Sequence, residues 1–110
     1  MFVCYRIIRR IPVTARDFYS QARLGRQRPV GVSLESWEAV SVFLTREQAI
    51  KQWRRKPHLG RFVARLELPD GTPRSEPNAR GHVDVYLAAE AIRSCVLDVQ
   101  EIEGRIESGE

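Results

Sequence analysis

Few groups in this chain are placed to do chemistry, and the most suggestive are an arginine, a serine and a helix start. Arg6 lies in an apolar segment, where an unpaired arginine is rare, and Ser41 lies in a second apolar segment that runs into Thr45. Thr45 is a good helix N-cap, and the free N–H groups at a helix start favour an anion. An arginine beside them would bind the same phosphate or carboxylate through two hydrogen bonds. Glu67, on a later segment, is a candidate to accept a hydrogen bond from a sugar hydroxyl.

The same residues also have purely structural interpretations. Ser41 can bond the neighbouring backbone, Thr45 can serve only as a cap, and Arg6 can pair with Glu67 or Asp98. The functional interpretation requires Arg6, Ser41 and Glu67 to converge on one cleft, and the fold decides whether they do.

Charge is unevenly distributed along the chain. Residues 1–66 hold 14 Lys and Arg against 4 Asp and Glu, a net charge of +10, and residues 67–110 hold 4 against 10, a net charge of −6. This asymmetry predicts an anionic partner, or a basic half that packs on the acidic half within one molecule or across a homodimer. The residues predicted to bind are Arg26, Arg28, Thr45, Arg54, Arg55, Lys56 and His82. Other cations that could share this surface are Arg9, Arg10, Arg16, Arg23, Lys51 and Arg61.

A basic surface near Tyr19, Trp37 or Trp53 would suit nucleic acid, because phosphate contacts dominate nucleic-acid affinity and arginine bridges phosphate oxygens. An acidic protein surface fits the same charge equally well. The sequence contains no helix-turn-helix, RNA-binding aromatic pair or zinc-finger pattern. We therefore expect a small binding or regulatory domain that recognises nucleic acid or an acidic protein surface and needs no cofactor.

The chain lacks the sequence motifs of the well-known catalytic classes. It has no phosphate-binding glycine loop, no nucleophile elbow and no cluster at metal-ligand spacing, so no metal site is expected. Of the two histidines, His58 follows a proline in a basic turn, and His82 begins a predicted strand near Asp84. His82 is the better candidate for positioning a substrate, and the alternative is an ordinary strand-end residue. Cys4 and Cys95 stand in apolar contexts and are expected to be buried hydrophobes.

The hydrophobic pattern predicts the scaffold that must position these groups. Apolar and β-branched segments predict strands at residues 2–9, 39–44, 61–68, 82–87 and 95–102. Capping patterns predict helices at residues 15–24, after Thr14, and at 46–56, where Thr45 and Gln48 form a capping box. Shorter helical turns are expected at residues 33–37 and 88–94, and an irregular loop at 72–81.

This order of elements predicts an α+β fold in a single domain, with a mixed sheet of about five strands, two main helices and one short helix. We expect the domain to span residues 1–102 and residues 103–110 to form a flexible acidic tail. A chain of 110 residues with 43% apolar composition can form a core without a metal or a disulfide. It has no membrane-spanning run and no signal-peptide pattern, so we expect a cytoplasmic protein without a membrane partner.

One resemblance adds an enzymatic alternative. An arginine on a first strand, a serine on a strand that runs into a helix and a glutamate on a later strand are similar to the Arg-Ser-Glu pattern of the ADP-ribosyltransferase fold. In that family the arginine binds NAD, the serine supports the nicotinamide-ribose pocket and the glutamate polarises the ribose 2′-hydroxyl or the acceptor. The resemblance implies a minimal NAD-dependent ADP-ribosyltransferase-like enzyme that uses Arg6, Ser41 and Glu67, with Glu101 as a second choice of glutamate.

The match to that pattern is partial. The serine stands in Val-Ser-Val-Phe-Leu-Thr rather than in Ser-Thr-Ser, and the usual Glu-x-Glu or Gln-x-Glu is missing. The segments around Asp17 and Ser41 also resemble short uncharacterised bacterial proteins, and that resemblance implies no activity.

Overall fold

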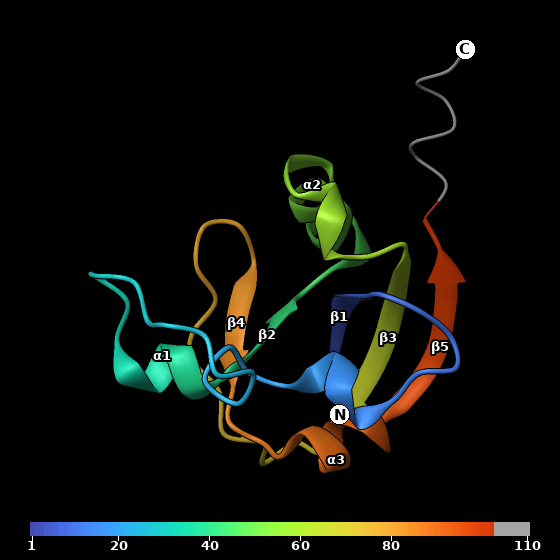
Figure 1. The fold of residues 1–110 in the computed structure, drawn as a ribbon. Helices are drawn as coiled ribbons and strands as arrows, with labels where there is room; N and C mark the ends of the chain where they lie inside the picture. The colour runs from blue at the N-terminus through green and yellow to red at the C-terminus, as the bar shows by residue number, and fades with distance from the viewer. Residues whose placement is uncertain (103–110) are drawn as a thin grey trace.

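A central strand organises the sheet. In the computed structural model, which describes residues 1–102, β1 (Phe2–Ile8) lies in the middle of five strands in the order β4-β2-β1-β3-β5 (Figure 1). The others are β2 (Val40–Phe43), β3 (Phe62–Leu68), β4 (His82–Val85) and β5 (Val96–Glu101). The β-branched and aromatic side chains of β1 suit a strand that is covered on both faces. The predicted α+β fold in one domain is confirmed.

The prediction of a mixed sheet is wrong, because all neighbouring strands of the described sheet are antiparallel. The reason is the position of β1. Helix α2 (Arg46–Arg55) carries the chain from β2 to β3, and these two strands flank β1 on either side. They run parallel to each other without being neighbours, because both are antiparallel to β1.

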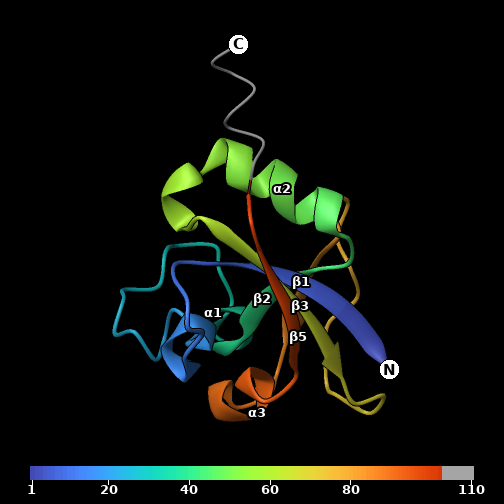
Figure 2. The same ribbon diagram turned by 90° about the vertical axis from the view of Figure 1, so that its right-hand side faces the viewer.

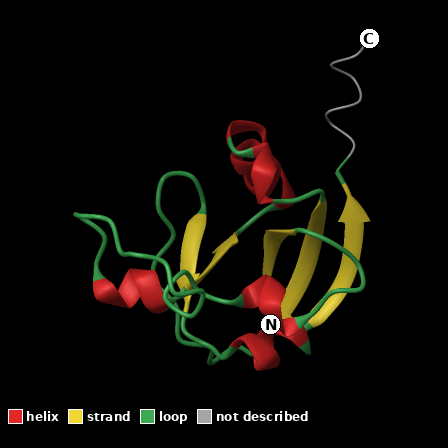
Figure 3. Ribbon diagram, viewed as in Figure 1, coloured by secondary structure: helices red, strands yellow, loops and turns green. Residues whose placement is uncertain are grey.

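Helices cover both faces of the sheet (Figures 1 and 2). On one face, α2 packs Ala49, Ile50 and Trp53 against a cluster that includes Ile7 and Phe43. The other face is covered by the 3₁₀ helix η1 (Ala15–Phe18) and by α3 (Ala89–Arg93). Phe18 and Ile92 join the larger cluster there, which also holds Cys4, Ile8, Val42, Leu66 and Val83. The five-residue α1 (Leu34–Glu38) and the 3₁₀ helix η2 (Pro57–Leu59) complete the helices of residues 1–102 (Figure 3).

The prediction of α2 is confirmed, whereas the helix predicted at residues 15–24 is wrong. Thr45 and Gln48 form the expected capping box at the start of α2. Thr14 and Asp17 also form a capping box, but it begins only the four-residue η1, and Tyr19 is already extended. The carbonyl of Asp17 would accept the next helical bond, yet it accepts a bond from Arg6 Nε at 2.9 Å instead. A tertiary contact therefore ends this helix after one turn.

The segment between β3 and β4 is held along the outer edge of β4. Ser75 and Asp84 exchange two bonds, from Ser75 N to the Asp84 carbonyl and from Asp84 N to Ser75 Oγ, both at 2.9 Å. Tyr86 N donates to the Pro73 carbonyl in the same arrangement. This irregular segment thus covers the edge of the sheet and supports the backbone of β4.

The remaining predictions on the whole chain have mixed outcomes. Among residues 1–102 there is no helix with the length and apolar character that a membrane crossing requires. Cys4 is fully buried as expected, while Cys95 is only half-buried at the margin of the same core cluster. The acidic tail predicted at residues 103–110 lies outside the described residues.

Candidate anion-binding cleft

The central strands β1 and β2 part from each other, and a cleft opens between them. Within residues 1–102 the two strands share one register pair, Tyr5 with Phe43. Beyond it, β1 stays paired with β3 as far as Ile8, and β2 stays paired with β4. The cleft at this gap has a volume of about 680 Å³, which is within the usual range of ligand pockets.

The cleft is strongly basic. Its cationic lining residues are Arg6, Arg9, Arg10, Arg16, Arg26 and Lys56, and its carboxylate is Asp17. Oδ2 of that carboxylate already accepts a bond from Thr14 N at 2.8 Å. Among the described residues, the ion pairs between arginine and carboxylate side chains involve other cations, namely Arg23 with Glu90, Arg61 with Glu101 and Arg65 with Glu67. The carboxylates of residues 67–110 therefore pair with cations other than the arginines and the lysine that line the cleft.

Arg6 bridges the two sides of the gap. Its Nε donates to the Asp17 carbonyl at 2.9 Å, and its Nη1 donates to the Ser41 carbonyl at 2.7 Å. The guanidinium also lies 6.0 Å from the centre of the Phe18 ring. Burial lowers the pKa of Arg6 to about 10, against the opposing effect of the nearby Asp17 charge, so the group remains cationic at neutral pH. Nη2 has no hydrogen-bond acceptor among the described residues, which leaves it available to a bound anion.

The structure brings Arg6 to the backbone carbonyl of Ser41, whose side chain lies on the other face of the sheet, and leaves Glu67 elsewhere. Arg6 and Ser41 line the same cleft, and Arg6 pairs with the Ser41 carbonyl rather than with the carboxylate of Glu67 or Asp98. Glu67 lies opposite Val3, so it points to the other face of the sheet from Arg6. It lines a separate depression of about 290 Å³ and contacts Arg65 at 3.3 Å. The convergence that the three-residue site requires is not formed.

Glu101, the second choice of glutamate, is also remote from Arg6. It lies on the edge strand β5, and its carboxylate contacts Arg61 at 3.2 Å. β3 separates β5 from β1 in the sheet.

His82 is firmly positioned at the cleft. The Asn78 side chain accepts bonds from the backbone N–H groups of Arg80 and His82, at 2.8 and 3.0 Å. Gly81, with a φ of +76°, brings the chain against the Gln48 side chain of α2, where a Cβ would clash. The imidazole then lies edge-on to Phe43, with ring centres 5.7 Å apart. The capping box of α2 thus borders the turn that presents His82.

The other residues predicted to bind divide into two groups. Arg26 and Lys56 line the cleft together with His82. Arg28 donates to the Val32 carbonyl, and Arg54 and Arg55 are exposed on α2 outside the cleft. Thr45 Oγ1 and N are both used in the capping box, so Thr45 acts as a cap.

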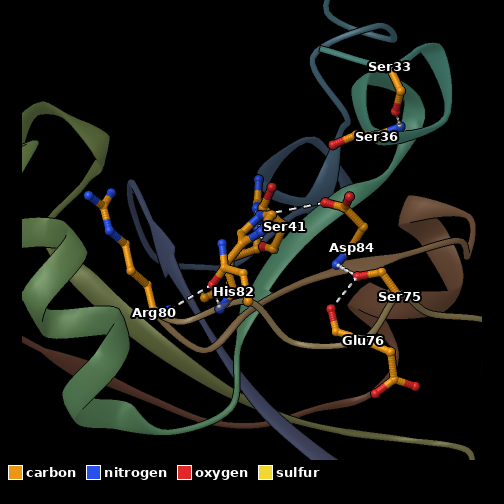
Figure 4. Close-up of polar contacts among 10 residues, drawn as sticks. Ser33, Ser36, Ser41, Ser75, Glu76, Arg80, His82 and Asp84 are labelled. Atoms are coloured by element: carbon orange, nitrogen blue, oxygen red, sulfur yellow. Dashed lines mark hydrogen bonds and ion pairs between the residues drawn. The ribbon is translucent and has the colours of Figure 1, made fainter. Parts of the chain in front are cut away.

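Asp84 lies next to the cleft residue His82 without lining the cleft itself, and the sequence analysis did not select it. It is 9% exposed, and its Oδ1 lies 3.5 Å from His82 Nε2 (Figure 4). Residues two apart on a strand point to one face, so the His-x-Asp spacing could have indicated this pair. Ser41 faces Asp84 across the β2–β4 ladder.

Compared with protein-family models, with curated proteins and with solved structures, the chain has no significant match. The function must therefore be argued from the geometry of the cleft.

Proposed function

We propose that the protein binds an anionic strand in the basic cleft, and that single-stranded nucleic acid is the strand it suits best. The observation that carries this proposal is the lining: five arginines and one lysine around a gap in the sheet, with Asp17 as the carboxylate. Arginine is favoured at such sites because its planar fork bridges two phosphate oxygens. The cleft volume of about 680 Å³ suits part of a single strand and not a duplex.

Aromatic groups beside these cations support the choice of nucleic acid. Tyr19 and His82 line the cleft and are partly exposed, and Arg23 lies 3.9 Å from the centre of the Tyr19 ring. Bases stack on aromatic rings and on guanidinium planes with little dependence on sequence. An acidic polypeptide could satisfy the cations but would not use these rings.

Binding can be measured by fluorescence anisotropy with a single-stranded oligonucleotide, the matching duplex and polyglutamate. If about four phosphates are neutralised, affinity for the single strand should fall about 50-fold between about 50 and 200 mM salt. Tighter binding of polyglutamate would indicate an acidic protein partner instead. Absence of salt-dependent binding to any of the three would refute the proposal.

Two adjacent arginine pairs give a matched test of the cleft. Arg9 and Arg10 are exposed and line it, whereas Arg54 and Arg55 are exposed on α2 and lie outside it. The double variant Arg9→Ala/Arg10→Ala should weaken binding and reduce the salt slope by about 0.7 for each lost phosphate contact. The double variant Arg54→Ala/Arg55→Ala removes the same charge and should have little effect. Equal losses in both would mean that a diffuse basic surface binds the strand.

The NAD-dependent transferase stays a prediction without support from the geometry, because Glu67 lies outside the cleft that holds Arg6 and Ser41. Calorimetry with NAD is its direct test: no heat of binding, with no change on Arg6→Ala, would end it. The expected cytoplasmic location and homodimer also stay predictions.

A further inference from the structure

The guanidinium of Arg6 is held in one position on one face of the sheet. Side chains two residues apart on a strand share a face, so Arg6 lies on the face of Cys4, which η1 covers. Nε donates to the Asp17 carbonyl at 2.9 Å, and Nη1 donates to the Ser41 carbonyl at 2.7 Å. Both acceptors are main-chain carbonyls, so the two bonds fix the cation without neutralising it. A donor that is already fixed loses little entropy when it binds a ligand.

The third nitrogen of this guanidinium reaches the cleft. Nη2 of Arg6 has no hydrogen-bond acceptor among residues 1–102, and it is not one of the unpaired side-chain atoms that are buried within that range. The carboxylate of the cleft, Asp17, is turned to Thr14, whose N and Oγ1 contact Oδ2 at 2.8 and 3.3 Å. The N–H groups of Nη2 are therefore placed to donate to an anion that enters from the cleft.

Arg6 differs from the other arginines of the cleft in depth. It is half-buried between η1 and β2, whereas the others are exposed, namely Arg9, Arg10, Arg16 and Arg26. Water and salt screen a charge interaction less at a half-buried group than at the exposed rim. His82 does not belong to this recess, because it pairs with Phe43 and shares the face that packs on α2. An anion with more than one negative charge therefore gains most at Arg6.

The phosphorylated end of a strand is the anion that fits this recess. A phosphate inside a strand is a diester, and it carries a nucleoside on each side. Both nucleosides would have to pass through the space between η1 and β2 that Arg6 already bridges. A terminal phosphate is a monoester with one attached nucleoside, so it can enter from one side. It also carries a charge of about −1.5 to −2 at pH 7 and offers its free oxygens to a guanidinium.

We propose that Arg6 recognises the phosphorylated end of a single strand, while the exposed arginines of the cleft bind the phosphates that follow. This inference rests on the proposed function, since it requires a strand in the basic cleft. It gives the two kinds of arginine different tasks: the fixed one binds a monoester, and the exposed ones bind diesters whatever the sequence. A monoester at the 5′ end and one at the 3′ end present the same chemistry to Arg6, and the test separates them.

The test is fluorescence anisotropy with an internally labelled single-stranded oligonucleotide. The same sequence is prepared with a 5′-phosphate, with a 3′-phosphate and with hydroxyls at both ends. A hydroxyl-ended strand two nucleotides longer matches the net charge of the phosphorylated strands. One of the phosphorylated strands should bind about 10-fold more tightly than both hydroxyl-ended strands, the effect expected of a charge-assisted hydrogen bond. Inorganic phosphate at constant ionic strength should displace that strand first, because it competes for the same recess.

Two variants locate the preference. Arg6→Lys keeps the charge but lacks the planar fork, so it should remove most of the preference for the phosphorylated end. A urea unfolding curve confirms that this variant is folded, and the comparison of strands in the wild-type protein stands without it. The double variant Arg9→Ala/Arg10→Ala should instead weaken the binding of both kinds of strand and keep the preference.

Three outcomes would overturn the proposal. Equal binding of the phosphorylated and hydroxyl-ended strands would refute it and leave the proposed function intact. A longer hydroxyl-ended strand that binds as tightly as the phosphorylated one would mean that net charge decides the affinity. A preference that persists in Arg6→Lys would assign the terminal phosphate to another group. Absence of binding by every strand, in contrast, would refute the proposed function itself and this inference with it.

Discussion

Replacing Arg6 by methionine should destabilise the protein strongly, although within residues 1–102 its hydrogen bonds go to two carbonyls and not to a carboxylate. Methionine keeps an unbranched side chain of similar reach but cannot donate hydrogen bonds. The carbonyls of Asp17 and Ser41, on the two sides of the gap between β1 and β2, would both lose their charged donor. The η1 turn would then lose its hydrogen bond to β1, and β2 would keep the Tyr5–Phe43 pair without the support of Arg6.

The magnitude follows from the two bonds. Hydrogen bonds to a charged group contribute about 1.5 to 3 kcal/mol each, and the cleft allows water to replace part of this. We therefore expect Arg6→Met to lower the free energy of unfolding by about 3 kcal/mol, a large share of the about 5 to 15 kcal/mol typical of a domain. Arg6→Lys keeps the charge but reaches only one carbonyl, so it should lose about half as much.

Urea unfolding followed by tryptophan fluorescence measures this loss. With a slope of about 1.5 kcal/mol/M, the midpoint should fall by about 2 M in Arg6→Met. Arg65→Met is the matched control, because Arg65 lies on the adjacent strand, is exposed and contacts only Glu67 among the described side chains. Exposed pairs of that kind contribute about 0 to 1 kcal/mol. Similar midpoints for the two variants would refute the bridging role of Arg6.

Two further predictions concern Cys4 and the turn before His82. Burial raises the pKa of Cys4 from its ordinary value of 9.0 to about 12. Above about pH 9 the unfolded chain therefore releases a proton that the folded protein keeps. Between about pH 9 and 11, the free energy of unfolding should therefore fall more steeply in wild type than in Cys4→Ala, by about 1.4 kcal/mol for each pH unit. Urea unfolding at each pH measures this difference, and equal slopes in the two proteins would contradict it. Gly81→Ala should cost more than about 1 kcal/mol, because an added Cβ meets Gln48 at a positive φ. The loss should shrink in a Gln48→Ala background, and strict additivity would exclude that clash.

Capping patterns and hydrophobic spacing in the sequence predicted those helices whose ends are set by residues nearby in the chain. The Thr45–Gln48 capping box and the apolar stripe of Ala49, Ile50 and Trp53 gave α2 almost to the residue. The same kind of signal at Thr14 was correct about a helix start and wrong about its length. That helix ends because Arg6, eleven residues earlier in the chain, takes the Asp17 carbonyl. The helix propensity of residues 15–24 carries no information about a contact with a residue in another element.

The candidate site depended on strand register, which a single sequence does not define. Arg6 lies opposite Ala64, and therefore Glu67 falls on the other face of the sheet. A shift of one residue in that pairing would have put Glu67 on the face of Arg6, because side chains alternate along a strand. Arg6 and Ser41 could be selected because each is a polar outlier in an apolar strand, although their contact runs through the Ser41 carbonyl. Asp84 was missed because the strand pattern around it was assigned from the valines alone.

The basic cleft and the gap between β1 and β2 have one origin. Where β1 and β2 part, the register leaves the half-buried Ser41 carbonyl without a backbone partner on β1, and such a carbonyl without a donor would be costly. Arg6 supplies that donor from β1 itself and also ties down η1 through the Asp17 carbonyl. A cation is thereby fixed at a gap in the sheet, where the surrounding arginines add to its attraction for anions. Closing the gap with normal β1–β2 pairing would satisfy Ser41 but would remove both the cleft and the reason for an arginine at this position.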